Sequence, residues 1–341
     1  MIIPEEAKPA ELVYSNPGIE ANPESPPPGP GAIYVAFNYD YLLMAAYSAT
    51  TAKRVTPGLE VAVITNVPLR LDNAHLAPFD YIYFTDVDTK YNRIYKLTAH
   101  RYAPWEKAVF IDCDTEVQRD LSPAWEIMGH HDVAVRQLDY PARKDYPVLG
   151  ELSSLYAPVW NSGVIFFRRT PGAIRLFDAW MEHYFYLSIH VDQPSLARTI
   201  INTPEVRVLS LNAYWNAKPG PMRRYSNQSE RSPAIYHYCK PENDRRIVSQ
   251  LSAMDSAIGS LVEDGAEVQA VRRKYRVLRA IPYLGRPFIQ RYLKRLEILV
   301  RKLSRGRVII GMSRQSFKKD MKKDFKSTKS RSESTGNSNG D

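Results

Sequence analysis

The sequence predicts an α/β fold in which a mixed, mainly parallel sheet is flanked by helices, and the order of the first elements is the leading observation. Residues 32–37 and 61–65 are apolar and rich in β-branched side chains, which is typical of buried strands. Between them we expect a helix over residues 41–53 that starts at residues 38–40. A strand, a helix and a strand in succession predict a parallel pair with a crossover helix. Ligands of such sheets bind beyond the carboxyl ends of the strands, where residues 38–40 would lie.

The same alternation of strands and helices continues to about residue 241 and is the second observation. Thr170 and Pro171 form a typical helix start, and the apolar residues that follow them recur at helical spacing, as in a helix that packs against a core. Other helical segments are expected near residues 93, 122 and 192, and residues 140–158 are expected to form a long irregular loop. Further strands are expected within residues 81–84, 108–111, 132–135, 160–168, 209–216 and 234–241.

Four regions follow from composition. Residues 1–30 contain eight prolines and few apolar residues, which predicts an extended, disordered leader. Residues 31–245 hold the α/β domain, residues 246–306 a helical extension with a basic amphipathic helix, and residues 307–341 a basic disordered tail.

Charge is distributed unevenly along the chain. Residues 272–331 contain 21 Lys and Arg against 3 Asp and Glu, a net charge of +18, which leaves 25 basic and 34 acidic residues elsewhere, a net charge of −9. The two cysteines, Cys113 and Cys239, make no disulfide framework and no zinc cluster, which fits a reducing compartment. The chain starts without a basic and apolar leader, and no run approaches the roughly 18 apolar residues of a membrane span. We therefore expect a cytoplasmic protein.

The most informative motif is a pair of carboxylates at the end of the strand over residues 108–111. Side chains two residues apart in an extended chain point the same way, so Asp112 and Asp114 can converge on one cation while Cys113 faces the interior. Oxygen ligands favour Mg²⁺ or Mn²⁺, and such ions usually bind between carboxylates and the phosphates of a substrate. A turn that merely uses two aspartates is the structural alternative. A rival pair, Asp86 and Asp88, follows a less apolar strand, so we favour the later pair.

A small polar turn precedes the strand within residues 160–168. Gly163 permits close approach of the backbone, and the amide of Asn161 offers a donor and an acceptor that suit a sugar hydroxyl. An ordinary turn is the alternative for this segment too.

Taken together, these motifs resemble the family 8 glycosyltransferases of the glycogenin and galactosyltransferase type, which have the GT-A fold. The resemblance covers roughly residues 33–243. Its most specific parts are Tyr95-Lys96-Leu97, the strand that ends in Asp112-Cys113-Asp114, the turn Asn161-Ser162-Gly163-Val164, and Asp192-Gln193, in the order of the family.

The resemblance implies a set of site residues. Asp112 and Asp114 would be the metal-binding pair and His237 the third protein ligand of Mn²⁺ or Mg²⁺. Asp192 and Gln193 would serve catalysis at the sugar of a UDP-sugar donor. The remaining donor-site residues would be Asn38, Tyr39, Asp40, Lys96, Cys113, Asp139, Asn161, Ser162, Gly163 and Lys240.

Two departures from the family pattern concern the phosphates and the donor sugar. The family places a phosphate-binding lysine six residues beyond the histidine in a glycine-containing loop, whereas Lys240 follows His237 by three with no glycine between them. Where the family often has glycine beside its Asp-Gln pair, this chain has Pro194.

The implied reaction is transfer of a sugar, with retained configuration, to a glycan, lipid-linked or protein acceptor. A nucleotidyltransferase that makes nucleotide sugars is a competing hypothesis, but it needs a glycine-rich phosphate loop after the first strand, and residues 37–41 contain no glycine. A non-catalytic nucleotide-binding or nucleic-acid-binding module is a second alternative. It would need interleaved aromatics or a recognisable module beside the basic residues, and the sequence has neither, so no nucleic acid is expected.

The basic segment predicts an anionic membrane surface as a partner through residues 272–331. Apolar residues between 287 and 306 recur at spacings of three and four and form one helical stripe, and basic residues occupy the rest of that segment. Packing of the stripe on the catalytic domain is the alternative.

Overall fold

The computed structural model describes residues 8–16, 29–138, 147–149, 152–153, 157–187, 192–218, 232–239 and 244–280. The chain divides into two compact units, residues 1–286 and 287–341, and the second unit lies outside the described residues. The second unit contains the predicted amphipathic helix and the predicted tail, which therefore lie outside the described residues. Two predicted site residues of the first unit, Asp139 and Lys240, also lie outside them.

An eight-stranded sheet organises the first unit, and its strand order is β1-β4-β3-β2-β5-β10-β7-β11. The pairs β2–β3, β2–β5, β3–β4 and β7–β11 are parallel, whereas β10 runs antiparallel to β5 and β7, and β1 runs antiparallel to β4. This mixed, mainly parallel sheet confirms the predicted α/β class. Its strands are β1 (Glu11–Ser15), β2 (Pro30–Ala36), β3 (Glu60–Thr65), β4 (Tyr81–Phe84), β5 (Lys107–Ile111), β7 (Val133–Gln137), β10 (Trp160–Arg168) and β11 (Val208–Leu211).

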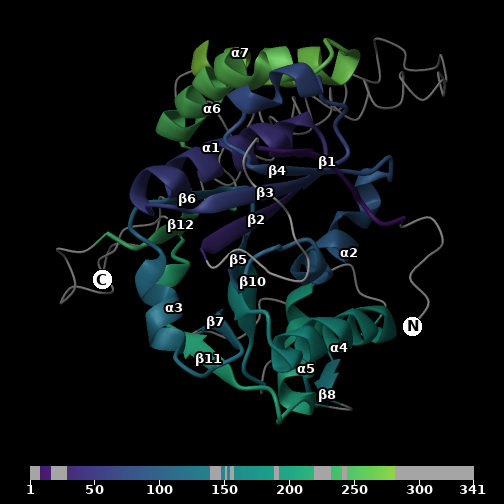
Figure 1. Cartoon of the computed structure of the whole chain (residues 1–341), viewed down its shortest axis with the longest axis vertical. Coiled ribbons are helices and arrows are strands. Elements are labelled where there is room, and N and C mark those ends of the chain that lie inside the picture. The colour runs from purple at the N-terminus through teal and green to yellow at the C-terminus, as the bar shows by residue number, and fades with distance from the viewer. Residues whose placement is uncertain are drawn as a thin grey trace, which may run out of the picture. The chain divides into compact units, whose positions relative to one another are not determined.

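Helices cover both faces of the sheet. Figure 1 shows α1, α6 and α7 on one side of the central strands and α2, α4 and α5 on the other. The helices are α1 (Tyr39–Val55), α2 (Asn92–Leu97), α3 (Ser122–Met128), α4 (Pro171–Leu187), α5 (Asp192–Asn202), α6 (Arg245–Ile258) and α7 (Ala266–Ala280). Short 3₁₀ helices are Leu71–Leu76, Thr89–Tyr91, Ala99–Arg101, Ala213–Trp215 and Gly259–Leu261.

Two small sheets lie outside the large one. β6 (Thr115–Val117) pairs antiparallel with β12 (Ile235–His237), and β8 (Pro147–Leu149) pairs with β9 (Leu152–Ser153). The first of these joins the turn after β5 to a segment more than a hundred residues later.

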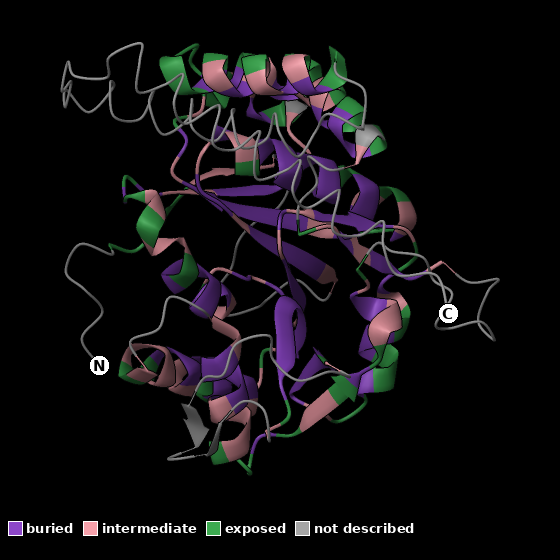
Figure 2. Cartoon of the chain, turned by 180° about the vertical axis from the view of Figure 1, so that it is seen from behind, coloured by how far each residue is buried: buried purple, intermediate pink, exposed green. Residues whose placement is uncertain are grey.

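The core is continuous across the central strands, which Figure 2 shows as buried, whereas exposed residues gather on the outer side of α7. Trp105 packs against Gly31 in β2, where a Cβ atom would lie only 1.9 Å from the indole ring. The large buried side chains Phe110, Phe166, Phe177 and Trp180 fix the packing of β5, β10 and α4. A rigid sheet of this kind holds the loops beyond its strand ends in fixed positions.

The prediction of a disordered leader is wrong for residues Glu11–Ser15, because they form β1 at the edge of the sheet. Asn16 holds the end of this strand: its backbone N–H donates to the carbonyl of Asp80 (2.9 Å), and its side-chain amide donates to Oδ1 of Asp80 (2.6 Å). Leu12, Val13 and Tyr14 have high strand propensity, and the surrounding prolines conceal this short segment in the composition.

In the parts of the chain that the structure describes, no helix combines the length and the apolar composition that crossing a bilayer requires.

Candidate functional site

The turn after β5 carries the carboxylate pair at the centre of the sheet. Asp112 and Asp114 both approach the imidazole of His237, whose Nε2 lies 3.8 Å from Oδ2 of Asp112 and 3.2 Å from Oδ1 of Asp114. Cys113 points the other way, as the alternation of an extended chain predicts, and its thiol donates to the carbonyl of Val35 (3.2 Å).

His237 reaches this turn because β12 pairs with β6. The register places His237 opposite Thr115, and the backbone N–H of Tyr238 donates to the carbonyl of Asp114 (2.8 Å). His237 is only 6% exposed. The backbone of two distant segments therefore fixes the imidazole beside the carboxylates.

Residues 161–163, predicted as a turn, lie within β10, and the antiparallel direction of this strand brings them to the same place. Since β10 starts where β5 ends, the backbone N–H of Asp112 donates to the carbonyl of Gly163 (2.7 Å). A Cβ atom at Gly163 would lie 2.3 Å from Cε1 of His237 and 2.7 Å from Oδ2 of Asp112. Glycine is required here because the imidazole and the carboxylate occupy the space of any side chain.

Lys96 links the carboxylate pair to the start of α5. Its ammonium group donates to Oδ1 of Asp112 (3.1 Å), to Oγ of Ser162 (3.2 Å) and forms an ion pair with Oδ2 of Asp192 (2.7 Å). Ser162 in turn donates to Oδ2 of Asp192 (2.8 Å). Lysine side chains are rarely buried unless their charge is paired, and buried, fully hydrogen-bonded ammonium groups are common in functional sites.

Asp192 is the first residue of α5, and the packing of α4 fixes its backbone. The indole N–H of the buried Trp180 donates to the carbonyl of Asp192 (3.1 Å) and to Oγ of Ser195 (3.0 Å). Gln193 follows as the second residue of the helix and is half-buried.

These charged groups shift one another's pKa values. Burial disfavours the charged form of Lys96, but Asp112 and Asp192 outweigh this effect and raise its pKa. Burial opposes ionisation of Asp192 as well, yet Lys96 and Ser162 lower its pKa. Burial raises the pKa of Asp112, although Lys96 and His237 act against it.

His237 shows the largest consequence of this clustering. Burial disfavours the imidazolium, but hydrogen bonds to Asp114 and Cys239 and the charges of both aspartates raise the pKa of His237 to about 10. Burial opposes ionisation of Asp114, and the hydrogen bond and charge of His237 lower its pKa. A protonated imidazole thus neutralises part of the carboxylate charge in this cluster.

Behind the histidine lies an amide network that the sequence alone did not reveal. Oδ1 of Asn216 lies 3.1 Å from Nδ1 of His237, and the side-chain amide of Asn216 donates to Oδ1 of Asn161 (3.1 Å). Oδ1 of Asn161 also accepts from the backbone N–H of Gly163 (2.9 Å). Asn161, predicted to face a sugar, is 3% exposed and its oxygen is used within this network. With Nδ1–H directed at Asn216, Nε2 is left facing the carboxylates.

Residues 38–40 follow β2, and two of them contact the C-terminal helices. The phenol of the buried Tyr39 donates to Oδ1 of Asp255 in α6 (2.6 Å), and its backbone N–H donates to Glu267 in α7 (3.0 Å). Asp40 accepts from Lys274 and Tyr275 in α7.

Asn38 has a positive φ of 76° and caps α1 by accepting from the backbone N–H of Tyr41. Tyr41 is 42% exposed, and partial loss of solvent around its phenol, together with the nearby charge of Asp114, raises the pKa of Tyr41 to about 12.

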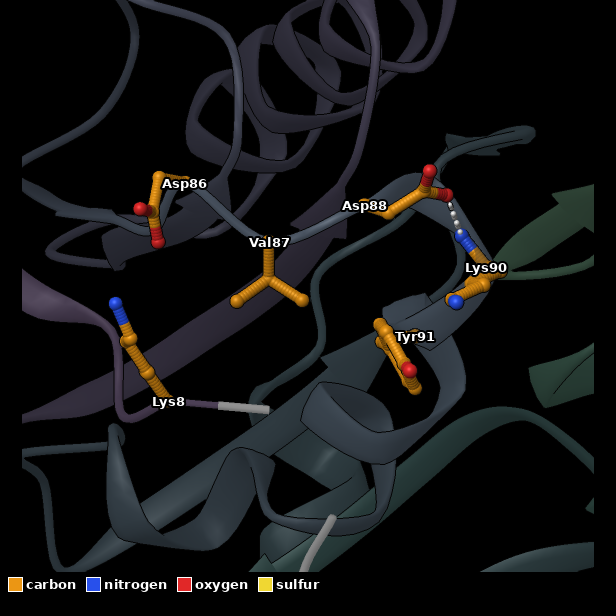
Figure 3. A pocket seen from close by; sticks show the side chains of 6 residues that line it. All are labelled: Lys8, Asp86, Val87, Asp88, Lys90 and Tyr91. Atoms are coloured by element: carbon orange, nitrogen blue, oxygen red, sulfur yellow. Dashed lines mark hydrogen bonds between the residues drawn. The ribbon is translucent and has the colours of Figure 1, made fainter. Parts of the chain in front are cut away.

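The rival pair does not converge. Figure 3 shows the carboxylates of Asp86 and Asp88 separated by Val87, with Asp88 directed at the backbone N–H of Lys90, from which it accepts at 2.9 Å. Both aspartates are exposed and line a pocket of about 380 Å³ with Lys8 and Tyr91. Asp88 thus has the local capping role that the turn alternative describes.

The residues at the end of β5 fit a divalent cation. Two carboxylates and one imidazole provide hard oxygen and borderline nitrogen donors, which suit Mn²⁺ and Mg²⁺, and Gly163 leaves the space beside them clear of a Cβ atom. Cys239 also reaches the cluster: one potential ligand atom each of Asp114, His237 and Cys239 lies within 4.8 Å of the others.

The chain resembles known proteins as follows. Residues 85–242 match the sequence model of the family described as glycosyl transferase family 8. Among solved structures, the galactosyltransferase LgtC in complex with donor and acceptor sugar analogues is 16% identical, with a TM-score of 0.46, and the match covers 71% of this chain and 99% of that one. Mouse xyloside xylosyltransferase 1 is 12% identical, with a TM-score of 0.40 over 61% of this chain and 97% of that one. GlyE of Streptococcus pneumoniae is 13% identical, with a TM-score of 0.44 over 61% and 54%. No curated protein matches the chain.

Proposed function

The chain is a family 8 glycosyltransferase, and from this premise we propose that it moves a sugar from a UDP-sugar to a glycan, lipid-linked or protein acceptor, with Mn²⁺ or Mg²⁺ and with retained configuration. The observation that carries the proposal is that carboxylate oxygens of both Asp112 and Asp114 lie within 3.8 Å of Nε2 of His237, at the carboxyl end of the central strand. Neither the nucleotidyltransferase nor the binding-module hypothesis is retained.

In this proposal Asp112, Asp114 and His237 hold the divalent cation. The bound cation supplies Lewis-acid neutralisation of the negative charge that develops on the β-phosphate as the bond to the sugar breaks. Asn216 orients His237 so that Nε2 faces the carboxylates. Gly163 allows the three ligands to stand this close together.

Asp192 has the second charged role. Positive charge develops on the sugar in an oxocarbenium-like transition state, which a nearby carboxylate stabilises. Lys96 and Ser162 keep Asp192 ionised and hold its orientation, since both hydrogen-bond the same oxygen. Gln193, next along the helix, is placed to contact the donor sugar, while Asp139 and Lys240 remain donor-site predictions outside the described residues.

The site predicts that the nucleotide and the cation bind together. Asp112, Asp114 and Asp192 carry more negative charge than Lys96 and a protonated His237 offset, so a diphosphate alone is repelled. Calorimetry should show UDP binding with Mn²⁺ and no binding in EDTA. Equal binding in both conditions would contradict the proposal.

The basic C-terminal segment suggests where the enzyme acts. We propose that residues 272–331 dock the enzyme on an anionic membrane surface on the cytoplasmic side, where it meets its acceptor. This step rests on the sequence pattern of residues 287–306 and on the net charge of +18 over residues 272–331.

A further inference from the structure

Cys239 occupies an unusual backbone conformation at the edge of the cation site. It follows β12 by two residues and has a φ of 58°, a left-handed value that only one other non-glycine residue in the described chain, Asn38, shares. For a residue with a Cβ atom this conformation is unfavourable, and such strain collects at functional sites. Here the turn places the thiol beside the carboxylate and the imidazole.

The three side chains offer a donor set that differs from the one a Mn²⁺ site needs. Oxygen of Asp114, nitrogen of His237 and sulfur of Cys239 lie within 4.8 Å of one another. A thiolate with an imidazole and a carboxylate favours Zn²⁺, which takes such ligands in tetrahedral geometry at about 2.0–2.3 Å, so that ligand atoms stand roughly 3.3–3.8 Å apart. Oδ1 of Asp114 and Nε2 of His237 are already 3.2 Å apart, so only the sulfur of Cys239 has to come closer.

We propose that Asp114, His237 and Cys239 form a zinc site, and that Zn²⁺ bound there excludes the catalytic cation and inhibits the enzyme. The sulfur binds as the thiolate, and its proton passes to solvent. Oδ2 of Asp112, 3.8 Å from Nε2 of His237, or a water molecule completes the tetrahedron. The inference rests on the proposed function only in that both cations use His237 and Asp114.

The two cysteines provide a matched pair of variants. Cys239 is exposed at the cluster, whereas Cys113 is buried and its thiol is directed at the carbonyl of Val35. Replacing either by serine keeps the size of the side chain and removes one sulfur. Circular dichroism and the melting temperature verify that each variant is folded.

Co²⁺ serves as the probe, because a cobalt–thiolate bond gives a charge-transfer band in the near ultraviolet. The full-length protein should show this band, Cys113→Ser should keep it and Cys239→Ser should lose it. Competition between the two ions can be followed by electron paramagnetic resonance of Mn²⁺, and Zn²⁺ should displace Mn²⁺ from the wild type. Cys239→Ser should lower the affinity for Zn²⁺ by at least about tenfold and change the affinity for Mn²⁺ little.

Two results would overturn the inference: a cobalt spectrum without the thiolate band while Co²⁺ displaces Mn²⁺, or a band that persists in Cys239→Ser. Metal-dependent UDP binding without a thiolate band would reject the zinc site and leave the proposed function standing. A thiolate band in a protein that binds no nucleotide would support the zinc site and reject the proposed function.

Discussion

Asp112 and Asp114 approach one imidazole from a single turn, and they supply the two carboxylates of the proposed cation site. Asp112→Asn or Asp114→Asn should lower turnover of a UDP-sugar by at least about a hundredfold, because each replaces an anionic ligand with a neutral one. The fold should persist, since an amide fills the same space. Sugar transfer and the melting temperature are the measurements.

Asp86→Asn is the matched control for that prediction. Asp86 is exposed and separated from Asp88 by Val87, so its amide variant should retain most of the activity. An inactive Asp86→Asn together with fully active variants of the later pair would move the site to the rival loop.

The raised pKa of His237 predicts how cation binding depends on pH. Because that pKa is about 10 in the cation-free protein, His237 is protonated at neutral pH and must lose its proton to bind a metal. Mn²⁺ affinity should therefore rise by about tenfold per pH unit from pH 6.5 towards 9. Calorimetry in buffers with different ionisation enthalpies should detect about one proton released per ion.

The raised pKa of His237 has the opposite effect on the stability of the cation-free protein, which should fall as the pH rises. A pKa raised above the unfolded value of about 6.5 adds stability that is fully present below that pH and is lost as the pH rises through the folded value. His237→Asn should remove both effects. A pH-independent Mn²⁺ affinity in the wild type would show that the imidazole is already neutral.

The resemblance to the family placed Asp112, Asp114, Gly163 and Lys96 in one predicted site. Asp112, Asp114 and Gly163 lie beside one another because β5 and β10 are antiparallel neighbours, and Lys96 lies on the helix before them. Asn216 was missed, because nothing local indicates that a loop amide 55 residues after Asn161 will bond to it. The role of Cys239 was missed for a different reason: its spacing from other metal ligands matches no motif, and only the β6–β12 pairing brings it near Asp114.

At the scale of elements, the small β6–β12 sheet is held to α6 by a buried acid. Glu116 is 3% exposed and accepts from Arg246 and Tyr238. Burial opposes its ionisation, yet these hydrogen bonds lower its pKa, so its contribution to stability is present above the unfolded pKa and lost as the pH falls through the folded one. The guanidinium of Arg246 is half exposed, which limits the strength of the pair.

Glu116→Gln should lower the free energy of unfolding by about 1–2 kcal/mol, because a charge-assisted pair becomes a neutral hydrogen bond beside a partly solvated guanidinium. Urea denaturation measures the change. The control is Glu205→Gln, whose partner Arg175 is exposed, and no measurable change is expected there. Equal losses in the two variants would mean that burial does not strengthen the pair.

Helices and central strands could be predicted closely because their patterns are long and periodic. The helix expected over 41–53 is α1, Tyr39–Val55, and the Thr170–Pro171 start is that of α4. The edge strand β1 could not be predicted from composition, since five residues between prolines gain their stability from pairing with β4.

At the scale of the whole molecule, the acidic body and the basic C-terminal segment predict membrane docking. The chain should co-sediment with anionic vesicles and not with neutral ones, and salt should weaken binding, because each nearby cation contributes on the order of 1 kcal/mol against anionic lipid. Truncation after Ala280, the last residue of α7, should abolish binding.

A variant that replaces Leu293, Leu296 and Leu303 by serine separates the two parts of that prediction. It keeps every basic residue, so salt-sensitive binding of unchanged strength would assign docking to charge alone. Failure of the full-length chain to bind vesicles of any composition would leave the apolar stripe as packing on the catalytic domain.

The pairing of β6 with β12 also bears on the order of steps during folding. Glu116 in β6 and Tyr238, which directly follows β12, are joined by a hydrogen bond and are 122 residues apart along the chain. Contacts of such sequence separation form slowly, because the loop between them must close first. We therefore expect His237 to reach the carboxylates late in folding. In a refolding experiment, the appearance of tight Mn²⁺ binding should lag behind the recovery of helical circular dichroism, and the cation would report that folding of the domain is complete.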